Sequence, residues 1–236
     1  MSQITSIPRM SPDNPGCDFC DEFSNGHDNA FAARYGEEMQ DRTVLSTENF
    51  RVLPSIGQIV EGYIMVVPTA HYVAMGDLPV GLVEELRALL AFVRKALTET
   101  YGNCVLFEHG ARNDTAGGCG IYHAHLHAVP LVNSTDPIHE LRKLHSLIEI
   151  DGLDEIGPTT SGHPYLYYEA LDGRRYVSRV DQLQSQYMRR FIARLVGKSE
   201  WNWREAGKEP GLCSVAIRLS SWFALHSSPS ESLRIS

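Results

Sequence analysis

Three histidines at every second position are the residues best suited to carry out chemistry. His123, His125 and His127 alternate with apolar residues. Successive side chains of a β-strand point to opposite faces, so the three imidazoles are predicted to share one exposed sheet face, with the apolar residues toward the core. Because imidazole titrates near neutral pH, such a row suits metal binding, nucleophilic attack or acid–base work. The alternatives are a chance cluster and a purely structural metal site.

A cysteine pair near the start is the second candidate. Cys17 and Cys20 have the C-x2-C spacing of a metal clip or a redox pair, and the alternative is two ordinary free thiols. The chain has 5 cysteines, an odd number that does not suggest a disulfide framework. The first residues also lack the pattern of a secretory signal. Together these features predict a reducing, cytoplasmic compartment.

The surrounding pattern predicts the elements that position these residues. Strands are predicted at 49–53, 62–68, 104–108 and 121–129, helices at 77–101, 136–150 and 182–196, and a hairpin at 165–180. The Asp172-Gly173 pair within the hairpin is a typical two-residue turn. This order predicts an α+β fold with a largely antiparallel sheet, a long helix, a shorter helix and a C-terminal hairpin-helix extension.

The 236 residues allow one large domain or a domain with an appendage. We expect a flexible tail at 1–15, the domain that holds the motifs at 16–135, and the extension at 136–209. Residues 210–236 show no persuasive periodicity and are expected to be poorly ordered.

The net charge and the composition argue against two classes of partner, bulk nucleic acid and the membrane interior. The net charge of −8 argues against a protein that wraps nucleic acid by bulk charge, and no apolar run is long enough to span a membrane. Residues 174–204 nevertheless carry 8 basic and 2 acidic side chains. We interpret this stretch as a solvated helix face; the alternative is a patch that reaches substrate phosphates.

Three segments resemble the histidine-triad (HIT) superfamily. His123-Ala-His-Leu-His-Ala-Val resembles the triad signature, Val66-Val-Pro-Thr-Ala-His71 resembles the strand-ending Pro-x-x-His, and Phe107-Glu-His-Gly110 resembles the superfamily with its galactose-1-phosphate uridylyltransferase branch. The resemblance covers about residues 16–135 and implies a HIT-like fold. Residues 136–205 match only loosely.

The resemblance implies roles for the triad. His125 takes the position of the nucleophile that forms a covalent nucleotidyl-histidine, and His127 that of the residue at the phosphate and leaving group. His127 favours the hydrolase-like branches, since the transferase branch often has Gln there. Related hydrolases often carry Ser or Thr at the position of Gly120, so a backbone group or Asn113 is expected to bind the phosphate instead.

The resemblance also implies a phosphate-binding loop and a nucleoside pocket. Amides of the glycine-rich loop, including Gly118, Cys119 and Gly120, are expected to hold phosphate oxygens, and the alternative is a flexible hairpin loop. Ser55 falls in the nucleoside-pocket loop, where many members carry an acidic residue. His109 is either a lining residue of the active site or a structural histidine.

A structural zinc site follows from the same resemblance. Some HIT and uridylyltransferase members bind zinc through residues that correspond to Cys17, Cys20, His71 and His123. Four protein ligands leave no open position, so the metal is expected to be structural.

The resulting expectation is a nucleotide hydrolase or nucleotidyltransferase that acts on a nucleotide or nucleotide conjugate and forms a homodimer by sheet extension. One alternative is a zinc-stabilised protein that binds a nucleotide without turnover, and another is a triad that itself holds a catalytic metal. The enzymatic interpretation requires the central ring to be free to bond phosphorus; a buried or metal-bound His125 would contradict it.

Overall fold

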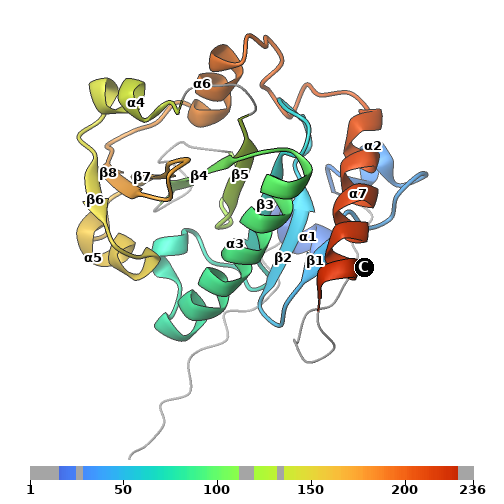
Figure 1. The fold of residues 1–236 in the computed structure, drawn as a ribbon, viewed down its shortest axis with the longest axis horizontal. Coiled ribbons are helices and arrows are strands. Elements are labelled where there is room, and N and C mark those ends of the chain that lie inside the picture. Colours follow the sequence, from blue (N-terminus) through green and yellow to red (C-terminus); the bar gives the residue numbers. More distant parts are fainter. Residues whose placement is uncertain (1–15, 25–28, 112–119, 132–135, 228–236) are drawn as a thin grey trace, which may run out of the picture.

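The structure is a computed structural model that describes residues 16–24, 29–111, 120–131 and 136–227. Its centre is one 8-stranded sheet in the order β1-β2-β3-β5-β4-β7-β8-β6, with all neighbouring strands antiparallel (Figure 1). The strands are β1 (Leu45–Ser46), β2 (Phe50–Pro54), β3 (Ile64–Pro68), β4 (Cys104–Gly110), β5 (Leu126–Pro130), β6 (Ile148–Ile150), β7 (Tyr165–Glu169) and β8 (Arg175–Arg179). The α-helices are α1 (Asp18–Phe23), α2 (Ala32–Tyr35), α3 (Val80–Thr100), α4 (Ile138–Leu144), α5 (Ile156–Thr160), α6 (Tyr187–Leu195) and α7 (Pro210–His226). The expected α+β class and antiparallel sheet are confirmed.

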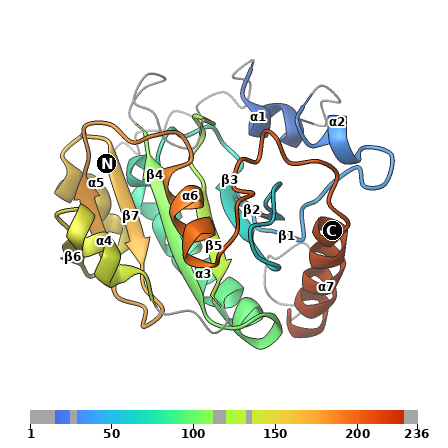
Figure 2. The same cartoon turned by 90° about the horizontal axis from the view of Figure 1, so that it is seen from above.

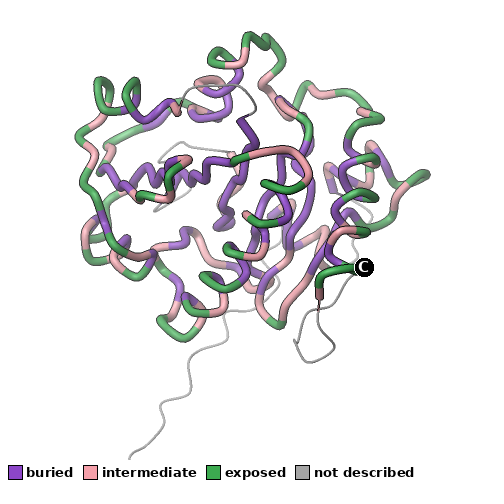
Figure 3. Tube along the Cα trace, viewed as in Figure 1, coloured by how far each residue is buried: buried purple, intermediate pink, exposed green. Residues whose placement is uncertain are grey.

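Alternate residues of the central strand β4 face the two sides of the sheet. Cys104 and Leu106 pack in an apolar cluster with residues of α3 and α7, whereas Val105 and Phe107 pack in a second cluster with residues of α4 and α6. Figures 1 and 2 show α3 and α6 on opposite faces of the sheet, and Figure 3 shows that the strands between them are buried. The sheet is therefore covered on both faces, and the C-terminal part of the chain contributes to each covering, with α7 on one face and α6 on the other.

The long helix begins later than predicted. Helix α3 starts at Val80 because Pro79, with ψ 143°, is its extended N-cap, and residues 75–77 form a short 3-10 helix instead. The predicted end is close to the observed one, since α3 ends at Thr100 and Gly102 follows with φ 109°. A glycine just past the end of a helix relieves the strain of a left-handed backbone.

Three other predicted elements are shorter than expected. The triad strand starts only at Leu126, because its pairing with β3 ends at the pair Val66↔Leu126. Before that point, the backbone N–H of Ala124 donates to the carbonyl of Tyr72 in a loop. The helix predicted at 136–150 ends at Leu144, and Ile148–Ile150 is the edge strand β6, paired with β8. The helix predicted at 182–196 starts at Tyr187, after a residue in the left-handed region.

Residues of the extension continue the main sheet. The predicted hairpin is confirmed as β7 and β8, with Gly173 at φ 84° in its turn. Strand β7 pairs with β4 in 5 successive residue pairs, from Leu106↔Glu169 to Gly110↔Tyr165. The sheet edges are consequently the short strands β1 and β6.

The expectation of poor order after Pro210 is wrong for residues 210–226. They form α7, whose inward side chains recur at helical spacing. Leu212 packs in a separate cluster near α2, and the others are buried against α3 and the sheet: Val215, Ala216, Leu219 and Phe223. The ring centroids of Phe223 and Phe92 are 5.3 Å apart. The expected tail at 1–15 and residues 228–236 lie outside the described residues.

None of the described helices combines the length and the apolar character that crossing a bilayer requires.

Candidate functional site

The triad lies where the chain enters β5. As predicted, the apolar residues between the histidines, Ala124 and Leu126, face the core with α3. The expected exposed histidine face is wrong, because His123, His125 and His127 are only 1%, 5% and 3% exposed. Phe19 of α1 packs against His123 and His125, and Arg189 of α6 lines a cavity with His125 and His127, so these helices cover this side of the sheet.

The hydrogen bond of His125 fixes its tautomer. Its Nδ1 lies 2.6 Å from the carbonyl oxygen of His123. Because a carbonyl oxygen only accepts, Nδ1 carries the ring proton and Nε2 keeps its lone pair. Burial lowers the pKa of His125 to about 4, although the bond to His123 opposes the shift; the positive charge of Arg189 also lowers it. The ring is neutral at pH 7, with Nε2 available as a nucleophile.

A small cavity lies against this ring. It has a volume of about 30 Å³, and its walls include His125, His127, Ser55, Met65 and Arg189. That space holds about one or two water molecules. Among the described residues Nε2 of His125 has no hydrogen-bond partner, yet it is not one of the fully enclosed unpartnered atoms, so it keeps some surface toward the cavity.

One of the two conditions that would contradict the enzymatic interpretation is present, because His125 is buried; the other, metal binding, is absent from the described residues. His125 is not one of the clustered metal-ligand side chains, but it is largely buried instead of open to solvent. A nucleotide is much larger than the cavity, so a substrate has to displace lining side chains to reach Nε2.

His127 is held by aromatic neighbours on the α6 side of the sheet. Its ring stacks on Phe107 at a centroid distance of 4.5 Å, and its Nδ1 lies 2.8 Å from the hydroxyl of Tyr63. Burial is the main cause that lowers the pKa of His127 well below its ordinary value, with the neighbouring His125 next. This ring is also neutral at pH 7 and lies beside His125, with centroids 4.7 Å apart.

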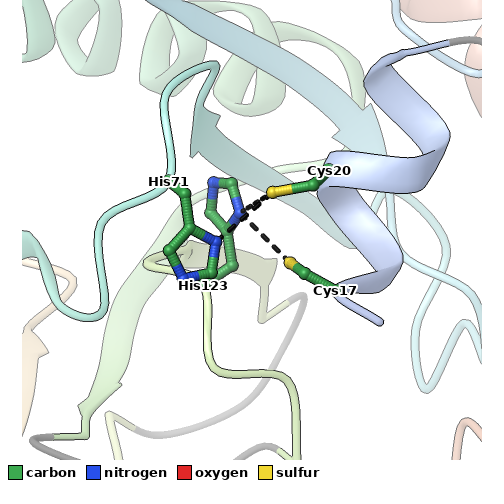
Figure 4. A group of neighbouring side chains, drawn as sticks. All are labelled: Cys17, Cys20, His71 and His123. Atoms are coloured by element: carbon green, nitrogen blue, oxygen red, sulfur yellow. Dashed lines mark hydrogen bonds between the residues drawn. The ribbon is translucent and has the colours of Figure 1, made fainter. Parts of the chain in front are cut away.

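The four residues expected to bind zinc come together. Ligand atoms of Cys17, Cys20, His71 and His123 all lie within 4.8 Å of one another, and all four side chains are buried (Figure 4). Helix α1 carries Cys20 and follows Cys17, while the histidines come from the chain after β3 and before β5. Figure 4 shows the two sulfur atoms pointing from α1 toward the two rings.

The donor set fits a tetrahedral metal. The His123 Nδ1 atom lies 3.4 Å from Cys17 Sγ and 3.6 Å from Cys20 Sγ, and the His71 Nδ1 atom lies 3.3 Å from Cys20 Sγ. Ligand atoms around tetrahedral zinc are roughly 3.3–3.8 Å apart. The Nε2 of His123 is 2.8 Å from the carbonyl of Pro68, so it carries the proton and leaves Nδ1 free to ligate.

Ser55 lines the cavity but already has two partners. Its Oγ donates to the carbonyl of Ile56 at 3.1 Å and accepts from Nη1 of Arg189 at 3.0 Å. The side chain is buried, with 3% exposure. Ser55 therefore orients a neighbouring cation on one wall of the cavity.

His109 lies beside the triad, outside the walls of the cavity. Its Nε2 accepts a hydrogen bond of 3.0 Å from the backbone N–H of Met188, at the start of α6. Burial, followed by the charge of His125, lowers the pKa of His109 to about 3. Of the two roles considered for this histidine, the structure favours the structural one, which fixes α6 over the triad.

The expected phosphate-binding loop is described only at its end. Asn113, Gly118 and Cys119 lie outside the described residues. Gly120 has φ 79°, and its carbonyl accepts a hydrogen bond of 2.9 Å from Arg204. The left-handed backbone at this position disfavours Ser or Thr, and a Cβ here would also displace the end of the Arg204 side chain.

The sequence interpretation missed the role of Arg189. It belongs to the basic stretch 174–204, interpreted as a solvated helix face, and that interpretation is wrong for this residue, which is 2% exposed. The only signal was its presence among the basic residues, and helical spacing does not reveal that this one side chain turns toward the triad.

Comparisons with known proteins find matches among solved structures alone. No protein-family model and no curated protein matches the chain. Solved structures do match. The chain is similar to solved proteins of the histidine-triad (HIT) family.

Three of these HIT structures come from bacteria. A Zn-bound histidine triad family protein from Mycobacterium smegmatis is 23% identical, with a TM-score of 0.38 over 50% of this chain and 76% of that one. A HIT family protein from Bacillus anthracis is 17% identical, with a TM-score of 0.37 over 49% of this chain and 72% of that one. A member of the HIT family from Bacillus subtilis is 18% identical, with a TM-score of 0.39 over 50% of this chain and 75% of that one.

Proposed function

We propose that the protein is a nucleotide hydrolase or nucleotidyltransferase that acts at the α-phosphate through a covalent intermediate on His125. The observation that carries the proposal is the tautomer of this ring: Nδ1 donates to a carbonyl, so Nε2 keeps the lone pair, on a ring that lines the cavity. The spacing of the triad and its resemblance to the HIT signature support it.

The reaction proceeds in two displacements. The Nε2 lone pair attacks the α-phosphorus, a P–N bond forms, and the bond from phosphorus to the leaving group breaks with its electron pair on the leaving group. Water or another acceptor then attacks the same phosphorus, loses a proton and releases His125 with its lone pair restored. Splitting one hard displacement into two easier ones is the advantage of covalent catalysis.

The environment suits a nucleophile of this kind. A protonated ring would form an ion pair with the phosphate and would have no lone pair, whereas a neutral ring keeps its lone pair. Because the ring proton is on Nδ1, Nε2 needs no deprotonation before attack. His127, next to it, is placed to contact the phosphate and the leaving group. Negative charge that develops on the phosphate oxygens needs fixed donors nearby.

The metal belongs to the scaffold in this proposal. Cys17, Cys20, His71 and His123 would hold one zinc ion with no open position, and a closed tetrahedral site stabilises the fold without contacting substrate. We further propose a cytoplasmic protein that forms a homodimer; a dimer by sheet extension would pair β1 or β6 with its copy, since these strands are the edges.

The experiment is a turnover screen with adenosine phosphoramidate, dinucleoside polyphosphates and nucleotide sugars, with identification of the products. We expect at least one class to yield a nucleoside monophosphate. His125→Asn should reduce kcat by about 10³-fold or more, because the nucleophile is lost.

His139→Asn is the matched control, because His139 is an exposed residue of α4 and should retain full activity. Equal turnover by wild type and His125→Asn would contradict the mechanism. Tight nucleotide binding without turnover of any class would favour the alternative, a zinc-stabilised binding protein.

A further inference from the structure

Arg189 is a buried cation that no carboxylate of the described residues balances. Its side chain is 2% exposed, and its three hydrogen bonds go to neutral oxygens: the carbonyl of Trp201 at 2.8 Å, the hydroxyl of Ser55 at 3.0 Å and the carbonyl of Gly57 at 2.5 Å. Among the residues that the structure describes, no acidic group lies within ion-pair distance of this guanidinium. A buried charge without a counterion is costly, so such groups normally pair with an anion.

Some N–H donors of the guanidinium have no acceptor among the described residues. One N–H on each terminal nitrogen has no acceptor within the described part of the chain. The N–H groups left over on this planar fork can donate to phosphate oxygens.

The fork lies in the wall of the cavity that also contains His125 and His127. The guanidinium carbon is 5.1 Å from the ring centroid of Tyr63, whose hydroxyl contacts His127. The charge of Arg189 is felt at both histidines, where it lowers the pKa of each ring. An anion in this cavity would therefore lie close to both His125 and this cation.

Two contacts fix the start of the helix that delivers Arg189. His109 binds the backbone N–H of Met188 at 3.0 Å, and the Gln186 side chain donates to Asn202 at 2.7 Å. Gly57, whose carbonyl accepts from Arg189, is fixed as well, since the carboxylate of Glu209 accepts from the N–H of Gly57 at 2.9 Å. The guanidinium is held in advance of any ligand, as electrostatic stabilisation requires.

We infer that Arg189, supplied by the C-terminal extension, binds the phosphate group that His125 attacks. The inference deepens the proposed function and rests on it: the ligand class is a nucleoside phosphate, and the charge of its phosphate supplies the counterion that Arg189 lacks. The extension is thus part of the active site, and its basic side chain stabilises the negative charge of the phosphate during transfer.

The test compares ligands that differ only in the phosphate. Calorimetric titration measures the binding of a set of nucleoside 5′-monophosphates and of the corresponding nucleosides to wild type, Arg189→Gln, Arg189→Lys and Arg194→Gln. Arg194 is the matched control, because it lies on the exposed side of the same helix. Circular dichroism and the melting temperature establish that each variant is folded.

We expect Arg189→Gln to weaken monophosphate binding by roughly 10–100-fold, the size of a lost charged hydrogen bond, with nucleoside binding changed less than about 2-fold. Arg189→Lys, which keeps the charge, should lie between wild type and Gln. If Arg189→Gln does not fold, the same comparison with Arg189→Lys decides, and unequal losses for monophosphate and nucleoside support the inference. Equal losses for both ligands, or no loss, would overturn it, because a purely structural Arg189 does not distinguish the two.

Inorganic phosphate separates this inference from the proposed function. If wild type binds no nucleotide but inorganic phosphate raises its melting temperature in an Arg189-dependent way, the nucleotide function fails and the anion site stands. If wild type binds neither nucleotides nor phosphate, both fail.

Discussion

At the scale of single residues, a backbone carbonyl sets the tautomer of His125 and therefore which ring nitrogen can act as a nucleophile. The ring is oriented by a carbonyl two residues earlier in the chain, at a distance of 2.6 Å. The bond to that carbonyl selects the tautomer in which Nε2 keeps the lone pair, and burial keeps the ring unprotonated. Every-second-position spacing predicted a shared face for the histidines, but it could not predict that neighbouring elements cover this face.

His109 makes the stability of the fold depend on pH. Its pKa is about 3 in the folded protein and about 6.5 when unfolded, so between these values the unfolded chain binds a proton that the folded one does not. Stability from this group is complete above about pH 6.5 and falls as the pH decreases, by about 1.4 kcal/mol per pH unit.

His109→Gln, which keeps an acceptor but does not titrate, should reduce this dependence. Urea unfolding at pH 6.5 and pH 5 should show the wild type losing about 2 kcal/mol more than the variant. His139→Gln, on an exposed position, should behave as wild type. The same loss in wild type and His109→Gln would show that this ring takes up its proton in the folded state.

At the scale of elements, helix α1 depends on the cluster at its start. It has only 6 residues, too few to be stable alone, and both cysteines of the cluster lie in or next to it. A metal that joins Cys17 and Cys20 to His71 and His123 would attach this helix to the triad.

We therefore expect about one zinc ion per chain in the purified protein. Cys20→Ser should weaken zinc binding by at least about 10–100-fold and lower the melting temperature, because a ligand is lost. Metal analysis by mass spectrometry checks this, with Cys213→Ser, away from the cluster, as the control. Unchanged zinc in Cys20→Ser would refute the site, and two zinc ions per chain would favour a metal held by the triad.

Helix α7 is part of the core, in contrast to the disorder expected for it. Phe223→Ala should reduce the free energy of unfolding by about 3–5 kcal/mol, since its ring is fully buried against α3. Leu225→Ala on the same helix should change it by less than about 0.5 kcal/mol, because Leu225 is 82% exposed. Denaturant unfolding measures both; a small change for Phe223→Ala would mean that α7 is not docked in solution.

At the scale of the whole molecule, local patterns predicted the elements better than their assembly. Alternation and turn chemistry identified the hairpin around Gly173, and the resemblance to the HIT superfamily predicted the four clustered metal ligands. The helical face of α7 was missed because Ile217 and Leu225 make its outer side apolar too, so little contrast marks the inner side. Arg189 could not be found because its contacts, to Ser55 and Gly57, are separated from it by more than 130 residues.

The assembly also limits access to the site. Side chains of α1 and of the segment that begins at α6 line the site beside His125 and leave a cavity of about 30 Å³, far smaller than a nucleotide. Binding must therefore displace side chains from the walls, and the proposed enzyme is expected to adopt a more open site when substrate is present.

The most direct measurement of the central claim is detection of the covalent intermediate. The protein is mixed with a substrate that it turns over, quenched under alkaline conditions because P–N bonds are acid-labile, and examined by intact-mass and fragment mass spectrometry. We expect one nucleotidyl group on His125 in wild type and in His139→Asn, and none in His125→Asn. Turnover without any adduct, or an adduct on a different residue, would contradict the assignment of His125 as the nucleophile.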